Sequence, residues 1–215
     1  MLTPSSSGSQ KKTGEEDKIL EVAREVGRQI GIPPTRFQRV LWIKHFPSDL
    51  CGFRGDTVFL SQSMIGKLEP EKWKPLLASY LMHKKTRRQG LLSTSLITAA
   101  EYLVLLFAGI VLIAQVFGTN GALLALGYSL VMTPIFLTNR STQDTKKRKL
   151  KADIEATKIA EREKFLQTLR KIDSFKLRDV ERAKKSGLMS HFSTRPSITA
   201  RIDNLLVKTD SASFR

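Results

Sequence analysis

Few side chains in this sequence have a type suited to chemistry. The chain contains three histidines, His45, His83 and His191, and a single cysteine, Cys51. Imidazoles bind metals or transfer protons near neutral pH, and a thiol acts as a nucleophile when a base lies within reach. A zinc site built from the three histidines is one alternative, but nothing in their spacing favours it. Cys51 precedes Gly52 in an expected loop, which favours a thiol without catalytic function.

Charged side chains next to apolar segments are the second group of candidates. Glu101 lies within the first apolar segment, where a carboxylate is costly and often functional. We expect it near the membrane interface, in a wet or protein-facing position. Residues 146–151 (KKRKLK) follow the second segment, where a cationic cluster binds anionic lipid headgroups or serves only to fix topology. The expected headgroup ligands are Lys146, Lys147, Arg148, Lys149 and Lys151.

Residues 91–138 predict a transmembrane helical hairpin. The first helix is expected over 91–117 and the second over 121–137, and residues 102–138 contain no charge. A helix needs about 20 residues to cross the hydrocarbon core, so the first is long enough and the second is near the short limit. Gly118-Thr119-Asn120-Gly121 has the composition of a tight turn. A buried hairpin in a soluble bundle is the alternative, which the cationic flanks disfavour.

The cationic flanks also predict the topology. Lysine and arginine are retained on the cytoplasmic side of a membrane helix. Residues 84–88 precede the first helix and residues 140–151 follow the second, and both stretches are rich in these cations. We therefore expect a two-pass membrane protein with both termini in the cytoplasm, or on the matrix or stromal side if the membrane is organellar.

The overall composition shows a strongly basic chain. Its 215 residues are 41% hydrophobic and 26% charged, with a formal net charge of +16. Such basicity suits nucleic acid or an anionic membrane surface. Acidic residues are interleaved with the basic ones over 140–186, which favours a solvated helix over a nucleic-acid site. One cysteine excludes an internal disulfide and fits a reducing compartment. The polar N-terminus does not predict a secretory signal, and residues 1–14 are expected to be a disordered tail.

The segments on either side of the hairpin predict an α+β domain. Helices are expected over 15–31, 70–88, 144–186 and 196–206, from apolar residues at helical spacing. Strands are expected over 39–43 and 57–60, with a turn at Gly55-Asp56. We expect residues 15–90 and 139–206 to fold together into one domain on one side of the membrane, with 207–215 as a tail.

Several of these segments together resemble the HtpX-type family of membrane zinc metallopeptidases. The similar pieces are ILEVAREVGRQIGIPP, RVLWIKH, GDTVFLSQSMIGKLEPEKWKPLLASYLMH, KLKADIEATKIA and FSTRPSITARIDNL, in that order. They cover about residues 17–206. The resemblance implies a zincin-like fold, mainly helical with a small sheet, that a two-helix transmembrane hairpin interrupts.

The chain departs from this family where the zinc chemistry takes place. The family's H-E-x-x-H motif places two imidazoles on one helix face and a glutamate beside them to activate water. The corresponding residues are Ser79-Tyr80-Leu81-Met82-His83. The glutamate that supplies the third ligand corresponds to Lys149, before Ala152-Asp153, and Ser-Thr-His-Pro has become Ser193-Thr194-Arg195-Pro196. Catalytic zinc needs three protein ligands, and one of the three is retained.

The resemblance therefore predicts a pseudoprotease that has lost its metal, with no cofactor and no catalytic residue. The leading hypothesis is a scaffold or accessory subunit of a membrane protein complex, bound to the bilayer and to other membrane subunits. Two alternatives remain open. One is an active zinc metalloendopeptidase with unusual ligands, His83 among them. The other is a membrane-anchored basic module that binds anionic lipid or, less favoured, nucleic acid.

Overall fold

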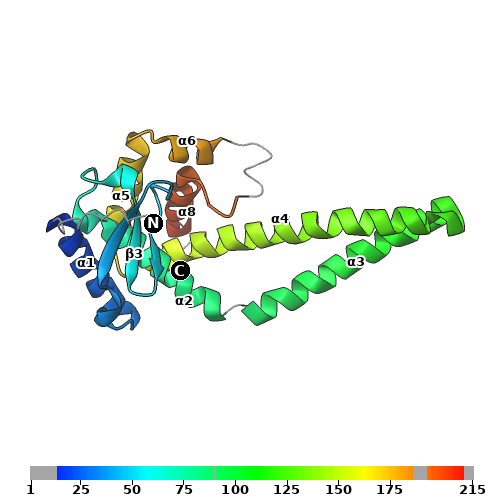
Figure 1. The fold of residues 1–215 in the computed structure, drawn as a ribbon, viewed down its shortest axis with the longest axis horizontal. Helices are drawn as coiled ribbons and strands as arrows, with labels where there is room; N and C mark the ends of the chain where they lie inside the picture. Colours follow the sequence, from blue (N-terminus) through cyan, green and yellow to red (C-terminus); the bar gives the residue numbers. More distant parts are fainter. Residues whose placement is uncertain (1–13, 90, 186–192, 211–215) are drawn as a thin grey trace, which may run out of the picture.

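The structure is a computed structural model that describes residues 14–89, 91–185 and 193–210. Helices predominate, and a compact body with a small sheet carries a long arm made of two helices (Figure 1). Three features expected from the sequence lie outside the described residues: most of the N-terminal tail, His191, and the last five residues of the chain.

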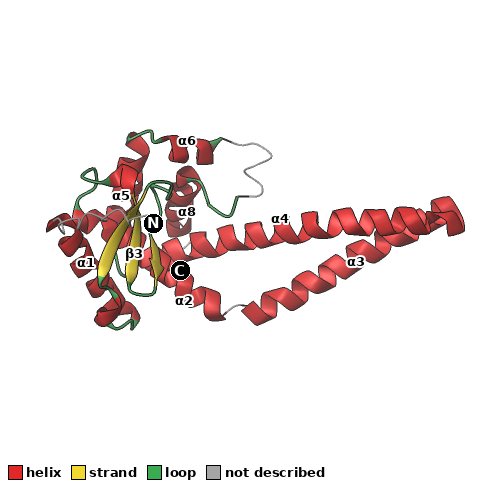
Figure 2. Cartoon of the chain, viewed as in Figure 1, coloured by secondary structure: helices red, strands yellow, loops and turns green. Residues whose placement is uncertain are grey.

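The sheet of the body has three strands, drawn in yellow in Figure 2. β1 (Arg39–Ile43) pairs in parallel with the central strand β3 (Thr57–Ser61), which pairs in antiparallel fashion with β2 (Gly52–Arg54). Gly55 has a φ of 63° in the turn between β2 and β3, a left-handed conformation that glycine adopts without strain. The sequence predicted β1 and β3 but not β2, which is three residues long and begins with a glycine.

Helix α1 (Gly14–Ile30) packs its apolar face on the body and ends at Gly31, whose φ is 85°. The acidic residues of its first turn suit the positive end of the helix dipole. The apolar residues at helical spacing, Ile19, Ala23, Val26 and Ile30, are buried together with Leu20, whereas Val22 is only partly buried. The 3-10 turn η1 (Pro34–Arg36) lies between α1 and β1 in the sequence. A second one, η2 (Gln62–Met64), directly follows β3.

Helix α2 (Lys74–Gln89) follows the 3-10 turn η3 (Pro70–Trp73) and joins the two halves of the body. Its buried side chains share one hydrophobic core with residues that follow the arm in sequence. Phe165 and Ile172 of α5 (Arg162–Ser174) and Leu205 of α8 (Ile198–Asp210) belong to this core together with Leu77 and Leu81 of α2. The segments before and after the arm thus form one folded body.

The arm consists of α3 (Leu91–Phe117), the 3-10 turn η4 (Gly118–Gly121) and α4 (Ala122–Ala156). Tyr102 of α3 hydrogen-bonds Thr133 of α4 and lies against Phe136, with ring centroids 5.6 Å apart. In the described part of the chain, one window, Ala100–Phe117, is long and apolar enough to cross a membrane, with a mean hydropathy of 2.2 and none of it buried.

The charged stretch after the arm is not the single long helix that we expected over 144–186. α4 ends at Ala156, and two separate helices follow: α5 (Arg162–Ser174) and α6 (Arg178–Lys184). The breaks contain neither glycine nor proline. Thr157 turns its hydroxyl back to the Ile154 carbonyl, and Lys176 adopts a φ of 48°, so the turns depend on packing that helical periodicity does not reveal. The last helix, α8 (Ile198–Asp210), runs four residues beyond its expected end.

Candidate functional site

A cavity of about 1130 Å³ opens where the arm meets the body. α2 and the polar half of α4 pack against each other along one side of it, and β2 with the preceding loop forms the other. Residues of the C-terminal segment, among them Thr194 and Arg201, complete the wall. Segments far apart in sequence therefore meet at one site.

All four degenerate motif positions line this cavity: Ser79, Tyr80 and His83 from α2, and Lys149 from α4. The spacing of Ser79 and His83 by four residues places both on one face of α2. Tyr80 instead directs its hydroxyl to the sheet, where it donates a hydrogen bond of 3.2 Å to the carbonyl oxygen of Phe53. The structure thus brings the sequence-predicted positions together.

At the centre of the site, Asp153 of α4 accepts three hydrogen bonds. Ser79 donates from Oγ to Oδ1 at 2.5 Å, and Arg201 of α8 donates from Nε and a terminal nitrogen to both carboxylate oxygens at 2.8 Å. Ser79, Asp153 and Arg201 are all buried. A two-pronged pair of this kind is geometrically specific, and each buried charge is compensated by its partner.

A second acidic centre extends the network toward the C-terminal segment. The buried Asp49 lies 2.5 Å from a terminal nitrogen of Arg195 and 3.7 Å from one of Arg201. Arg195 also pairs with Asp179 of α6 at 3.0 Å, and Ser48 donates to both oxygens of that carboxylate. Burial opposes the charged form of Asp179, but the hydrogen bonds from Ser48 and the nearby Arg195 outweigh it and lower its pKa.

The surroundings of the site shift the pKa values of three of its side chains. Burial would lower the pKa of Arg201, but Asp153 and Asp49 outweigh it and raise that pKa above its usual value. Burial raises the pKa of the Cys51 thiol well above its ordinary range, so the group is neutral and a poor nucleophile. Burial, together with the neighbouring Arg201, lowers the pKa of Lys149.

The donors of this site do not fit a catalytic zinc. Zinc in such sites takes three ligands from among His, Cys, Asp and Glu. The described residues hold no group of three such side chains placed to share an ion. Both oxygens of Asp153 already accept hydrogen bonds from Arg201, and Lys149 adds a further cation to the cavity wall. The buried carboxylates of this site therefore act as partners of arginine side chains in an ion-pair network.

Sequence reasoning missed the residues that hold the site together. Asp153 and Arg201 belong to segments that carry the family resemblance, yet neither was assigned a contact. Nothing in the sequence around Asp49 and Asp179 indicated a role in the site, because both are far in sequence from their partner Arg195 and meet it only in the folded chain. A buried charge needs a partner, so the pairing could have been sought only after the burial was known.

The remaining sequence candidates lie apart from the network. His45 is exposed beyond β1 and is not among the residues that line the cavity, whereas His83 is. Of the expected headgroup ligands, Arg148 and Lys149 line the cavity, whereas Lys147 and Lys151 are exposed and, four residues apart, share another face of α4. The helix thus divides the cluster between two surfaces, and its binding of lipid headgroups stays a prediction.

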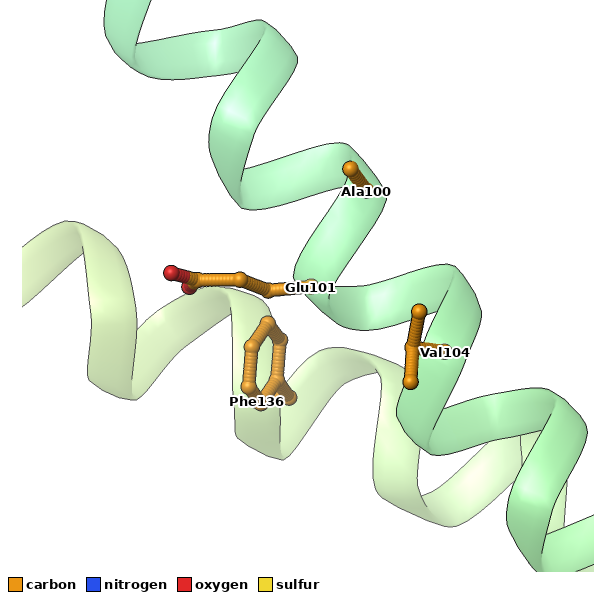
Figure 3. Close-up of a pocket in the computed structure, with 4 residues that line it drawn as sticks. All are labelled: Ala100, Glu101, Val104 and Phe136. Carbon is orange, nitrogen blue, oxygen red and sulfur yellow. The ribbon is translucent and has the colours of Figure 1, made fainter.

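Glu101 lies at a notch of about 440 Å³ between the two helices of the arm, lined by Ala100, Val104 and Phe136 as well. Figure 3 shows its side chain extending from α3 toward α4. There it pairs with Arg140 at 3.1 Å, and both side chains are partly exposed. The acid thus has a cationic partner on the opposite helix.

No protein-family model matches the chain, and no curated protein matches it.

Proposed function

We propose that this chain is a catalytically inactive, HtpX-like membrane pseudoprotease that acts as a scaffold or accessory subunit of a membrane protein complex. The observation that carries this proposal is that Ser79, His83 and Lys149 line one cavity. The resemblance assigns these three positions, from two different helices, to the zinc ligands of an active relative.

The contact between Ser79 and Asp153 supports the same proposal. A zinc-bound histidine usually donates its second ring N–H to a carboxylate, which fixes the ring's orientation. Asp153 lies within hydrogen-bond distance of position 79, as such a carboxylate would lie for an imidazole there. In this chain, Ser79 and Arg201 satisfy that carboxylate instead.

The surface of the arm supports insertion in a bilayer. Large apolar side chains are widely exposed there, among them Phe107 at 70% and Leu130 at 68%. The pair between Glu101 and Arg140 marks one end of the apolar zone. At about 1.5 Å per residue, residues 102–117 span about 24 Å, somewhat less than the ~30 Å hydrocarbon core. Local thinning of the bilayer accommodates such a mismatch. A two-pass hairpin places the whole body on one side.

Metal analysis of the detergent-purified chain tests the loss of catalysis. We expect substoichiometric zinc and no cleavage of a casein-type substrate. The triple variant S79H/Y80E/K149E rebuilds the family's donor set and should gain about one zinc per chain, because three ligands and an open position suffice. S79H/Y80E is the matched control, since Lys149 still repels the ion.

Two results would contradict the proposal. One is stoichiometric zinc in the unaltered chain that disappears in His83→Ala. The other is a folded triple variant that binds no more zinc than the double control. The first result would indicate an active metallopeptidase, and the second would indicate that the resemblance is misleading.

A further inference from the structure

The cavity beside Lys149 has two kinds of wall. One part is aromatic and aliphatic, with Phe46, Leu50, Phe53, Phe59 and Leu76. The other part is charged, and its cations outnumber its acids. The cations are Arg54, Lys84, Arg140, Arg148, Lys149 and Arg201, and the acids are Asp49, Asp144 and Asp153. Its volume of about 1130 Å³ exceeds the range of about 300–1,000 Å³ typical of small-molecule sites.

Lys149 is a partly buried cation of this wall that has no ion-pair partner of its own among the described residues. Asp153 is occupied by Arg201 and Ser79, and Asp49 lies between Arg195 and Arg201. In the described part of the chain, no carboxylate lies within ion-pairing distance of the Lys149 ammonium, although the side chain is only partly exposed. A partly desolvated cation without a counter-ion favours an anionic ligand.

The cavity begins where the apolar part of the arm ends. Arg140 and Ser141 line its outer end, directly after the apolar residues of α4, and Asp153 lines its inner end. At about 1.5 Å per residue, this stretch of α4 forms a wall of roughly 20 Å. A molecule with an apolar chain and an anionic head could enter the cavity from a bilayer around the arm. Its chain would then contact the aromatic wall, and its head would reach the cation Lys149.

We infer that the cavity between α2 and α4 is a binding site for an anionic amphiphile, with the phosphate or carboxylate head at Lys149 and the acyl chain against Phe46, Phe53 and Phe59. This site is distinct from the exposed lysines of α4. The inference rests on the membrane anchoring in the proposed function but not on the absence of zinc. Metal content and amphiphile binding are separate measurements, so either can fail alone.

Calorimetric titration of the full chain in a non-ionic detergent tests the inference with three probes. Dodecyl phosphate has both an anionic head and an alkyl chain. Dodecylphosphocholine has the same chain, but its head is zwitterionic. Inorganic phosphate has the negative charge without a chain. We expect dodecyl phosphate to bind most tightly. Lys149→Met should weaken its binding about tenfold, since a charge-assisted contact contributes about 1.5 kcal/mol or more. Lys158→Met, which removes an equally positive but exposed side chain outside the cavity, should leave it unchanged.

A second variant reports on the apolar wall. Leu50→Trp narrows the cavity without changing its charge and should also weaken the binding of dodecyl phosphate. The inference is overturned if both Lys149→Met and Leu50→Trp bind as the unaltered chain does. Equal binding of dodecylphosphocholine or of inorganic phosphate would overturn it too. A loss in Lys151→Met as large as in Lys149→Met would place binding on the exposed cluster instead.

Discussion

The two halves of α4 lie in one helix, but the first exposes large apolar side chains and the second buries a charged one. The first half leaves Leu130 and Ile135 exposed at 68% and 47%, whereas the second half fully buries a carboxylate, Asp153. In water, this distribution would be unfavourable at both ends. It becomes favourable if a bilayer surrounds the first half and the ion-pair network surrounds the second. The surroundings of the helix, rather than helix propensity, therefore account for its sequence.

The largest effect is expected from breaking the polar half. Arg201→Met leaves Asp153 buried without its cationic partner and removes one of the two cations beside Asp49, which should cost about 3–5 kcal/mol of unfolding free energy. Thermal and chemical unfolding in detergent measure this loss. Lys164→Met, which removes an exposed pair with Glu161, is the control and should change little. Similar stability of the two variants would show that the network does not hold the body together.

The apolar half is tested by placing a charge on it. Phe107→Lys should hinder insertion by up to about 2.5–3.5 kcal/mol, the cost measured for a lysine near the centre of a membrane helix. The fraction of the chain that stays in membranes after carbonate extraction should fall. Leu41→Lys, at an exposed apolar residue of β1, should not change it. Unchanged extraction of Phe107→Lys would indicate that this surface faces water or another protein.

The contact between the two arm helices should respond more weakly. A Cβ on Gly109 would lie 2.4 Å from the Tyr128 ring, so Gly109→Ala should cost about 1–3 kcal/mol by overpacking. Gly127→Ala meets no atom within 4 Å and is the matched control, since both changes bring the same gain in helix propensity. Equal melting temperatures of the two variants in detergent would indicate that Tyr128 does not pack against Gly109.

The smallest effect concerns the charge on Lys149. Because burial and Arg201 hold its pKa below the usual 10.5, the protonated form destabilises the folded state at neutral pH. Lys149→Met should therefore melt above the unaltered chain at about pH 7. Its advantage should shrink as the pH rises toward 10.5, because the unfolded chain then also loses that proton. An advantage that grows with pH would contradict the lowered pKa.

Local patterns predicted most elements of this fold but few of its contacts. Apolar spacing was enough for α1 and α2, and β-branched and aromatic runs were enough for β1 and β3. The end of α4 at Ala156 escaped prediction, because charged residues with good helix propensity continue beyond it. The break depends on how α5 packs into the core, and sequence periodicity does not report that.

The candidate site divides in the same way. Ser79, His83 and Lys149 were singled out by a resemblance of motifs, and the structure does place them around one cavity. Arg201 was not assigned a role, although it is fully buried and pairs with Asp153. An arginine in sequence looks like a surface residue, and its importance appears only when burial and partner are both known.

Because α4 is continuous, it fixes the orientation of the cavity residues relative to the arm. Arg140, paired with Glu101 at the edge of the arm, and Lys149, in the cavity wall, belong to one continuous helix. Each residue added between them would turn Lys149 by about 100° relative to the arm and move it about 1.5 Å. An insertion or deletion of about seven residues, close to two turns, would preserve the orientation of Lys149. Inserting or deleting a single residue would instead point the lysine out of the cavity.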